Sequence, residues 1–206
     1  MNGKEKLIFT EDAIYIEPTM GKGEAIMHVG EKELMIKLAD LVTQNGGDIL
    51  ELGFGLHLSA DAVQANPNVT SHTIIEIHPE IYEKALEWAK DKPNVKIILG
   101  NWIDIIPTLN QKFDGVLHDT HRDGNISVFL DMISYKCKIG CILGFFQYDK
   151  SDERFQSIKF PLKENDLNSL PYGDTHKFKT NEFELKITKY YGGGFHYKGK
   201  IEKTLV

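Results

Sequence analysis

Short β-rich runs and longer stretches with helical periodicity alternate along the chain. The first strong helical stretch covers residues 31–44, and Asn45-Gly46-Gly47 ends it with residues typical of a helix C-terminus. A strand is predicted directly afterwards over 48–52, and a second helix over 56–65. The apolar positions that form one stripe on the first helix are Leu34, Met35, Leu38, Leu41 and Val42.

The same plan repeats further along the chain. Pro79 is placed to open a helix in its first turn, and this helix is expected to turn inward Ile81, Ala85, Leu86 and Ala89. Such alternation predicts a mostly parallel sheet with helices on both faces. The remaining predicted elements are strands at 72–77, 95–99 and 113–118, a helix near 125–135, and a strand near 141–146.

The last part of the chain departs from this alternation. Residues 150–178 are polar with weak helical periodicity, whereas 183–191 and 195–204 have the pattern of two strands joined by Gly192-Gly193-Gly194. This pattern predicts a C-terminal antiparallel hairpin. The predicted fold class is therefore α/β and Rossmann-like, with a mostly parallel sheet, helices on both faces and a C-terminal hairpin, which is the layout of the class I methyltransferase fold.

The first thirty residues lie outside the β/α series. Leu7–Phe9 and Ala13–Glu17 predict a small hairpin. We therefore expect residues 1–30 to be an N-terminal extension that forms a hairpin and a lid over a cofactor, and residues 31–206 to be the main, methyltransferase-like domain.

Composition and charge narrow the classes of partner. With 206 residues, 41% of them hydrophobic and 26% charged, the chain has the size and balance of one globular domain. Its net charge of −6 disfavours a nucleic-acid partner, because phosphate binding needs a basic surface. A cationic small molecule suits such a protein better.

The cysteines and the apolar runs exclude further classes. Cys137 and Cys141 have no second Cys/His pair at metal spacing nearby, so no metal site is predicted and both are expected near a buried strand. No apolar run approaches the length of a membrane span, and residues 1–12 lack the apolar core of a signal peptide. We expect a cytoplasmic protein without a membrane partner, and the oligomeric state stays open.

In an open parallel sheet, ligands bind beyond the carboxyl ends of the strands. The first such position is Glu51-Leu52-Gly53-Phe54-Gly55-Leu56, where two glycines allow a tight turn and a close approach of backbone to ligand. The second is Glu76, followed by Ile77 and 25 positions beyond Glu51. A carboxylate there can accept hydrogen bonds from both ribose hydroxyls of an adenosine-containing ligand, and the alternative is a solvent-exposed strand end.

Two more positions follow the next strands. Asn101 and Trp102 can contact an adenine ring, although a core position for Trp102 fits the sequence equally well. Asp119 can orient or deprotonate a nucleophile at the mouth of a cleft, or cap a following helix. The four positions together are typical of class I methyltransferases, whereas nicotinamide dehydrogenases have a fuller glycine motif and do not need Asp119.

With these residues in place, the chain resembles guanidinoacetate N-methyltransferase and related arginine N-methyltransferases. The resemblance covers roughly residues 20–149, and its most specific segments are 49–55, 72–76 and 113–120; residues 195–206 are similar to the last strand of the family. It implies S-adenosylmethionine as the methyl donor, S-adenosylhomocysteine as the product, and a small molecule as the methyl acceptor.

The resemblance also implies roles for residues ahead of the first strand of the sheet. Met27 and Met35 would line the sulfonium end of the cofactor, and Glu31 and Asp119 would grip the guanidinium of the acceptor. Two carboxylates can bind a planar guanidinium in a forked geometry, and one can accept the proton lost as nitrogen attacks the methyl group. Without the resemblance, Glu31 is interpreted as an exposed first-turn carboxylate favoured by the helix dipole.

Three features depart from the family pattern. Gly30 stands where the family has tryptophan, and His118 stands where it has tyrosine. Residues 147–150 differ from the loop that binds the carboxylate of the substrate, and residues 150–178 barely resemble the family. The methyl donor is therefore better supported by the sequence than the acceptor.

The sequence thus predicts an enzyme that methylates a small guanidino or amino compound. Two alternatives stay open: methylation of protein arginine or another acceptor, and a module that binds S-adenosylmethionine without transferring its methyl group. Aminopropyl transfer and nicotinamide oxidoreduction are further enzymatic options. The predicted catalytic residues are Asp119 and Glu31. The predicted cofactor-binding residues are Met27, Met35, Glu51, Gly53, Phe54, Gly55, Leu56, Glu76, Ile77, Asn101, Trp102 and Asp119.

Overall fold

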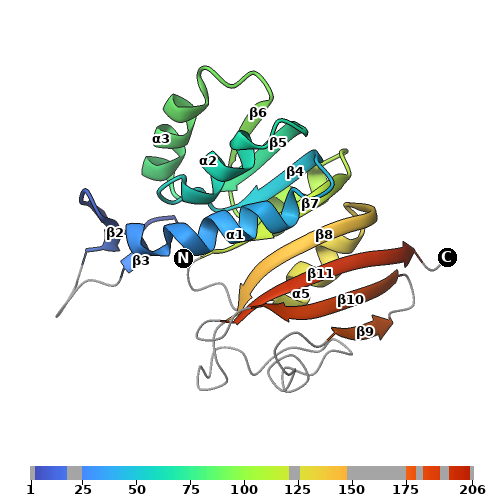
Figure 1. Cartoon of the computed structure of the whole chain (residues 1–206). Helices are drawn as coiled ribbons and strands as arrows, with labels where there is room; N and C mark the ends of the chain where they lie inside the picture. The colour runs from blue at the N-terminus through green and yellow to red at the C-terminus, as the bar shows by residue number, and fades with distance from the viewer. Residues whose placement is uncertain are drawn as a thin grey trace.

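An eight-stranded sheet runs through the computed structural model, which describes residues 3–17, 25–120, 126–147, 175–179, 183–190 and 195–204. The strand order is β6-β5-β4-β7-β8-β11-β10-β9, and the first five strands are parallel (Figure 1). The strands are β4 (Gly47–Leu52), β5 (Val69–Glu76), β6 (Val95–Leu99), β7 (Phe113–His118), β8 (Cys137–Gln147), β9 (Thr175–Lys179), β10 (Phe183–Tyr190) and β11 (Phe195–Thr204).

The strand order confirms the predicted α/β fold and locates its switch point. The chain starts the parallel sheet at β4, adds β5 and β6 on one side, and then returns to add β7 and β8 on the other. A ligand is therefore expected beyond the carboxyl ends of β4 and its neighbours. The predicted C-terminal hairpin is present as β10 and β11, antiparallel to each other and to β8. Strand β9, within the polar stretch, was not predicted.

Helices cover both faces of the parallel strands. One face carries α1 (Lys32–Val42), α2 (Leu58–Ala65) and α3 (Pro79–Ala89). The other carries α4 (Trp102–Ile105), the 3-10 turn η2 (Ile106–Thr108) and α5 (Ile126–Ser134). None of the helices in the described part of the chain is long and apolar enough to cross a membrane.

The apolar stripe of α1 packs where the periodicity predicts. Met35, Leu38 and Val42 are buried in one cluster with Ile49 of β4 and Leu117 of β7. Burial of a side chain of this size stabilises a fold by about 1.5–3 kcal/mol. The helix therefore fixes the two strands whose ends carry the candidate site.

A second, three-stranded antiparallel sheet lies at the carboxyl ends of the parallel strands. It consists of β1 (Leu7–Phe9), β2 (Ala13–Ile16) and β3 (Ala25–His28), and Figure 1 shows it beside the start of α1. Leu7 and Ile14 are buried in a cluster that reaches the main sheet. The expected pair β1–β2 is thus present, β3 was not predicted, and the division of the chain at residue 30 stays a prediction.

Several predicted boundaries differ from the structure for local reasons. Helix α2 begins at Leu58 instead of residue 56, because His57 has a left-handed φ of 54° and belongs to the preceding turn. Strand β5 covers 69–76, so it begins three residues earlier than expected and ends one residue earlier, before Ile77. The predicted strand near 141–146 begins at Cys137. Both cysteines are buried in it as free thiols, as expected.

One side chain of α3 was assigned to the wrong face. Ile81 and Ala85 are buried as predicted, but Leu86 is 39% exposed. The buried side continues to Trp88, which packs edge-on against Phe54 with ring centroids 5.3 Å apart. Leu86 follows Ala85 by one residue and therefore lies about 100° around the helix from it.

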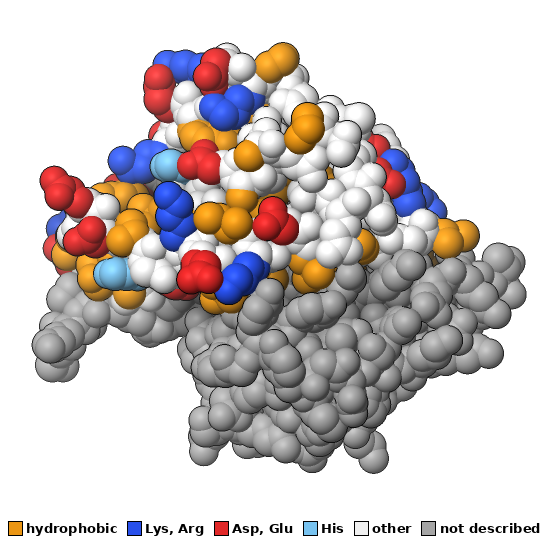
Figure 2. All heavy atoms as spheres, in the orientation of Figure 1, with side chains coloured by type: hydrophobic (Ala, Val, Ile, Leu, Met, Phe, Trp, Pro, Cys, Tyr) orange, Lys and Arg blue, Asp and Glu red, His pale blue; other side chains and the backbone are white. Residues whose placement is uncertain are grey.

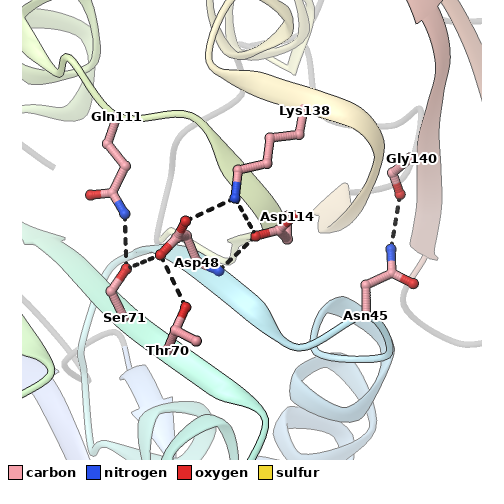
Figure 3. A network of polar contacts seen from close by, with 8 residues as sticks. All are labelled: Asn45, Asp48, Thr70, Ser71, Gln111, Asp114, Lys138 and Gly140. Atoms are coloured by element: carbon pink, nitrogen blue, oxygen red, sulfur yellow. Dashed lines mark hydrogen bonds and ion pairs between the residues drawn. The ribbon is translucent and has the colours of Figure 1, made fainter.

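The amino ends of the strands are tied together by a polar network (Figure 3). Lys138 Nζ lies 2.8 Å from Asp48 Oδ2 and 2.7 Å from Asp114 Oδ2, and Ser71 Oγ donates to Asp48. Partial burial opposes ionisation of Asp48, yet Lys138 and Ser71 hold the pKa of this carboxyl below its ordinary value. Asp114 and Asp48 together raise the pKa of Lys138. Thr70 and Gln111 extend the network, and Asn45 donates separately to the carbonyl oxygen of Gly140.

Candidate functional site

The ends of β4, β5 and β7 meet at the edge of the sheet opposite this network. The backbone N–H of Gly53, just after β4, donates to Ile75 of β5 over 2.9 Å. In the parallel register, Leu52 of β4 lies opposite His118 of β7, so Gly53 and Asp119 follow side by side. The four strand-end positions singled out in the sequence therefore share one edge of the molecule.

Two glycines allow other segments to approach the loop after β4. Gly53 has a φ of 89°, and a Cβ there would lie 3.2 Å from the carbonyl oxygen of Asp119. Gly55 has a φ of 51°, and a Cβ there would lie 2.6 Å from the sulfur of Met27, so the methionine side chain would have to move. The N–H of Leu56 donates to the same sulfur over 3.2 Å. The loop predicted to hold the cofactor thus lies between Met27 and Asp119.

Glu76 is buried rather than a solvent-exposed strand end, since only 3% of it is accessible. One carboxylate oxygen accepts the N–H of Phe54 over 2.9 Å, and the other accepts the N–H of His78 over 2.7 Å. Burial raises the pKa of Glu76, while these backbone donors act in the opposite direction. The N–H of Ile77 is a third backbone donor to Glu76, and since a carboxylate offers about four lone-pair sites, Glu76 retains the capacity to accept a further hydroxyl group.

Glu51 points into the protein instead of across the loop. Its side chain is fully buried, Ser59 Oγ donates to Oε1, and His72 Nε2 lies 2.8 Å from Oε2. Both oxygens are therefore engaged by α2 and β5. Ser59 and His72 were not selected from the sequence, although the alternation of β5 places His72 on the same face as Glu76.

Asp119 has a strongly perturbed carboxyl. Burial, then the nearby charges of Glu31 and Glu51, raise its pKa from 3.8 to about 7. Among the described residues, no lysine or arginine forms an ion pair with Asp119 or Glu31. Residues 121–125 lie outside the described part of the chain, so the helix-cap alternative for Asp119 stays a prediction. The structure therefore brings the two predicted acceptor-binding carboxylates within electrostatic reach of each other.

Glu31 also has a local structural role. Its Oε1 accepts the N–H of His28 over 2.8 Å, while His28 Nδ1 accepts the N–H of Gly30 over 2.9 Å. These reciprocal bonds form a capping box at the 3-10 turn η1 (Val29–Glu31) that leads into α1. Part of Glu31 remains exposed. A Cβ at Gly30 would lie 3.0 Å from the His28 ring, so the residue that replaces the tryptophan of the family fits tightly against the cap.

The positions after β6 are largely structural. Asn101 caps α4, its Oδ1 accepting the N–H of Ile103 over 3.0 Å. Trp102 is 5% exposed and packs edge-on against His118 and Phe129, with centroids 5.5 and 6.1 Å away. Of the two positions left open for Trp102, the structure shows the core position. His118, which replaces the tyrosine of the family, belongs to the same aromatic group.

Met35 lies in an apolar cluster against which Leu56 of the glycine loop packs. It is buried beneath α1 in the same apolar cluster as Met27. Met27 contacts the glycine loop directly, and Ile77 follows the last residue of β5. A Cβ at Gly3 would lie 2.5 Å from the carbonyl oxygen of Ile77, and His78 Nε2 lies 2.7 Å from the carbonyl oxygen of Glu5. The N-terminal segment therefore covers the end of β5.

On the face shown in Figure 2, acidic and basic side chains intermingle over the described elements. No extended basic area is present on the described part of this face. A nucleic-acid partner would need such an area to neutralise phosphates.

The sequence matches the family model of guanidinoacetate N-methyltransferase over residues 12–131. It is also 31% identical over 156 residues to protein arginine N-methyltransferase 2 of Yarrowia lipolytica, with 70% of this chain and 32% of that protein covered. The protein of the same name from Saccharomyces cerevisiae is 28% identical over 130 residues, which cover 58% of this chain and 31% of that protein. The chain thus spans about a third of the length of these curated relatives.

Solved structures share the fold at low sequence identity. Spermidine synthase from Thermotoga maritima aligns with a TM-score of 0.57 at 12% identity, over 96% of this chain and 72% of that one. The N-methyltransferase NodS from Bradyrhizobium japonicum aligns with a TM-score of 0.57 at 11% identity, over 83% and 95%. Likeness at this identity shows the fold alone. Because the family model matches more than half of the sequence, the chain belongs to the guanidinoacetate N-methyltransferase family of class I S-adenosylmethionine-dependent methyltransferases.

Proposed function

We propose that this protein transfers a methyl group from S-adenosylmethionine to a nitrogen of a small guanidino or amino compound, with guanidinoacetate as the model acceptor. One observation carries the proposal. Glu31 and Asp119 lie close enough to raise the pKa of Asp119, beside the glycine loop and without a cationic partner among the described residues. Two such carboxylates suit a planar cation, whose positive charge would offset their negative charge.

The residues at the strand ends fit the cofactor that the family uses. Glu76 retains acceptor capacity for a ribose hydroxyl, and Gly53 and Gly55 in the adjoining loop have no side chains that would hold a ligand away from the backbone. Met27, held at Gly55 and Leu56, would lie toward the sulfur end. Bound S-adenosylmethionine supplies a methyl group on a positively charged sulfur. Part of the role of these residues is to position that group, which lowers the barrier by aligning the reactants.

Asp119 has a pKa suited to the proton that the reaction releases. A carboxyl that titrates near 7 is partly protonated in the free protein at neutral pH, and a bound guanidinium would favour its ionised form. As the new C–N bond forms and the C–S bond breaks, the attacking nitrogen must lose one proton. The ionised Asp119 can accept it, and a carboxyl with a pKa near the working pH is an efficient acceptor.

A second candidate acceptor is an arginine within a protein. It is favoured by the 31% identity to protein arginine N-methyltransferase 2 over 156 residues. The same carboxylate pair would bind the side chain of arginine, since the guanidinium is identical. A module that binds S-adenosylmethionine without transferring its methyl group is the third possibility.

Transfer of radiolabel from S-adenosylmethionine distinguishes these functions. The full chain is incubated with labelled donor and, in parallel, with guanidinoacetate, small primary amines and an arginine-containing peptide. Label in guanidinoacetate or an amine is expected. Label in the peptide alone would favour the second function, and donor binding without transfer to any of them would favour the third. Failure to bind S-adenosylmethionine in calorimetry would overturn all three.

A further inference from the structure

A chain of buried polar side chains runs from α2 to the candidate site. Gln64 Nε2 lies 3.3 Å from His72 Nδ1, and His72 Nε2 lies 2.8 Å from Glu51 Oε2. The other oxygen of Glu51 accepts the hydroxyl of Ser59, in the first turn of α2. Glu51 and His72 are fully inaccessible to solvent. A buried ionisable pair of this kind is costly unless its hydrogen bonds are satisfied.

The orientation of Gln64 selects one protonation form of His72. The amide nitrogen of Gln64 can only donate, so Nδ1 of the imidazole accepts and carries no proton. Nε2 then carries the single proton and donates it to Glu51. In this arrangement Glu51 accepts a hydrogen bond from His72 and another from Ser59.

That charge lies next to Asp119 by the register of the sheet. Glu51 of β4 is opposite Leu117 of β7, and Asp119 is two residues beyond Leu117. Side chains two apart on a strand point to the same face, about 7 Å apart along the strand. Gly53, two residues beyond Glu51, has no side chain, so the backbone of Asp119 can lie close to it. A Cβ on Gly53 would lie 3.2 Å from the carbonyl oxygen of Asp119.

We propose that His72, held by Gln64, is a positioning residue that acts on methyl transfer through Glu51, by keeping a buried negative charge facing Asp119. The role for methyl transfer rests on the proposed function, but the electrostatic link does not. In the described part of the chain, the ionisable groups that face Asp119 are Glu31 from η1 and Glu51 from β4, and both disfavour a further negative charge there. His72 faces Glu51 from β5.

The link is tested by the titration of Asp119 itself, measured by carboxyl carbon NMR of aspartate-labelled protein and assigned with Asp119→Asn. Glu51→Gln removes the facing charge and is expected to lower the Asp119 pKa from about 7. His72→Leu removes a donor from buried Glu51, which is then expected to bind a proton, with the same result. His72→Gln keeps a donor at the position of Nε2 and is expected to restore the titration.

Thr73→Val is the matched control, because Thr73 is a buried neighbour on the opposite face of β5. It is expected to leave the titration of Asp119 in place. Gln64→Leu, at a less buried position, covers the case in which His72→Leu fails to fold. Without the hydrogen bond from Gln64, the His72 ring is no longer fixed toward Glu51, so the charge of Glu51 is held less well and the Asp119 pKa is again expected to fall.

The same variants separate this inference from the proposed function. An unchanged Asp119 pKa in Glu51→Gln, or an equal change in Thr73→Val, would overturn the inference whether or not methyl transfer is observed. A lowered pKa together with no methyl transfer to any acceptor would leave the electrostatic link standing and remove the proposed function. Where transfer is observed, the acid limb of its pH profile is expected to move to lower pH in Glu51→Gln.

Discussion

The two ends of the parallel sheet handle carboxylates in opposite ways. At the amino end, Asp48 and Asp114 share Lys138, at 2.8 and 2.7 Å (Figure 3). At the carboxyl end, Glu31 and Asp119 lie near each other without such a partner in the described part of the chain. The pKa of Asp48 is held below its ordinary value by its partners, whereas that of Asp119 is raised to about 7 by burial and like charge.

This difference separates charge that serves the fold from charge that serves a ligand. A paired carboxylate needs nothing further and contributes to stability. A buried carboxylate that faces other carboxylates costs free energy in the unliganded protein, and a bound cation removes that cost. Folds tolerate such sites where function requires them. The comparison therefore predicts that substitutions at the two ends change different measurable quantities.

The largest effect is expected from Asp119→Asn. This change keeps the shape of the side chain but removes the group that accepts a proton and binds the cation, so turnover should fall by about 10²–10⁴-fold. Affinity for S-adenosylmethionine should change by less than about threefold, because Glu76 and the glycine loop remain. Steady-state kinetics and calorimetry on the same preparations measure both quantities.

Asp114→Asn is the matched control at the other end of the sheet. It weakens the ion pair with Lys138 and should leave turnover per folded molecule unchanged. Full activity of Asp119→Asn, or an equal loss in Asp114→Asn, would contradict the division of roles between the two ends.

Asp119→Asn should also change how the free energy of unfolding depends on pH. Because the pKa of Asp119 is raised in the folded state, the folded protein binds more protons than the unfolded chain between about pH 4 and 7. Its contribution to the free energy of unfolding therefore falls as pH rises through this window. Asp119→Asn should gain stability relative to the parent between pH 4 and pH 8, on the order of 2 kcal/mol. Urea unfolding of both proteins at pH 4 and pH 8 measures this gain. A difference in free energy of unfolding between variant and parent that is the same at both pH values would contradict it.

Glu76→Ala should weaken cofactor binding by at least about tenfold, the loss of one charge-assisted hydrogen bond or more. The change also frees the N–H of Phe54 and His78, so thermal unfolding is measured alongside the calorimetric titration. Unchanged affinity in a folded variant would remove the ribose-binding role from Glu76.

The smallest effect is expected at the amino end. Lys138→Met leaves Asp48 and Asp114 facing each other without their cation and should lower the free energy of unfolding by about 1 kcal/mol, since the lysine is partly exposed. Cofactor affinity should be unchanged at temperatures well below the unfolding transition. A loss of affinity in the folded variant would show that the two ends are coupled.

The fold was predictable because periodic patterns are local. The stripe of α1 and the apolar runs of β6 and β7 identified their elements, the two strands to the residue. The short strand β3 and the polar strand β9 carry no such pattern, since their pairing depends on neighbours distant in sequence.

The candidate site was predictable where position on a strand decides it. Glu76 and Asp119 were found because residues after parallel strands share one edge. The burial of Trp102 and the hydrogen bonds of Glu51 to Ser59 and His72 depend on packing across elements. A single sequence without coordinates does not specify such contacts.

The central claim is that Asp119 and Glu31 leave a place for a cationic acceptor. Its most direct test is calorimetric titration of the protein, saturated with S-adenosylhomocysteine, with guanidinoacetate at pH 7 in two buffers of different ionisation enthalpy. Since Asp119 titrates near 7 and a bound guanidinium favours its ionised form, binding should release about half a proton per site. Asp119→Asn should abolish that release. Binding without proton release in the parent protein, or no binding at all, would contradict the account.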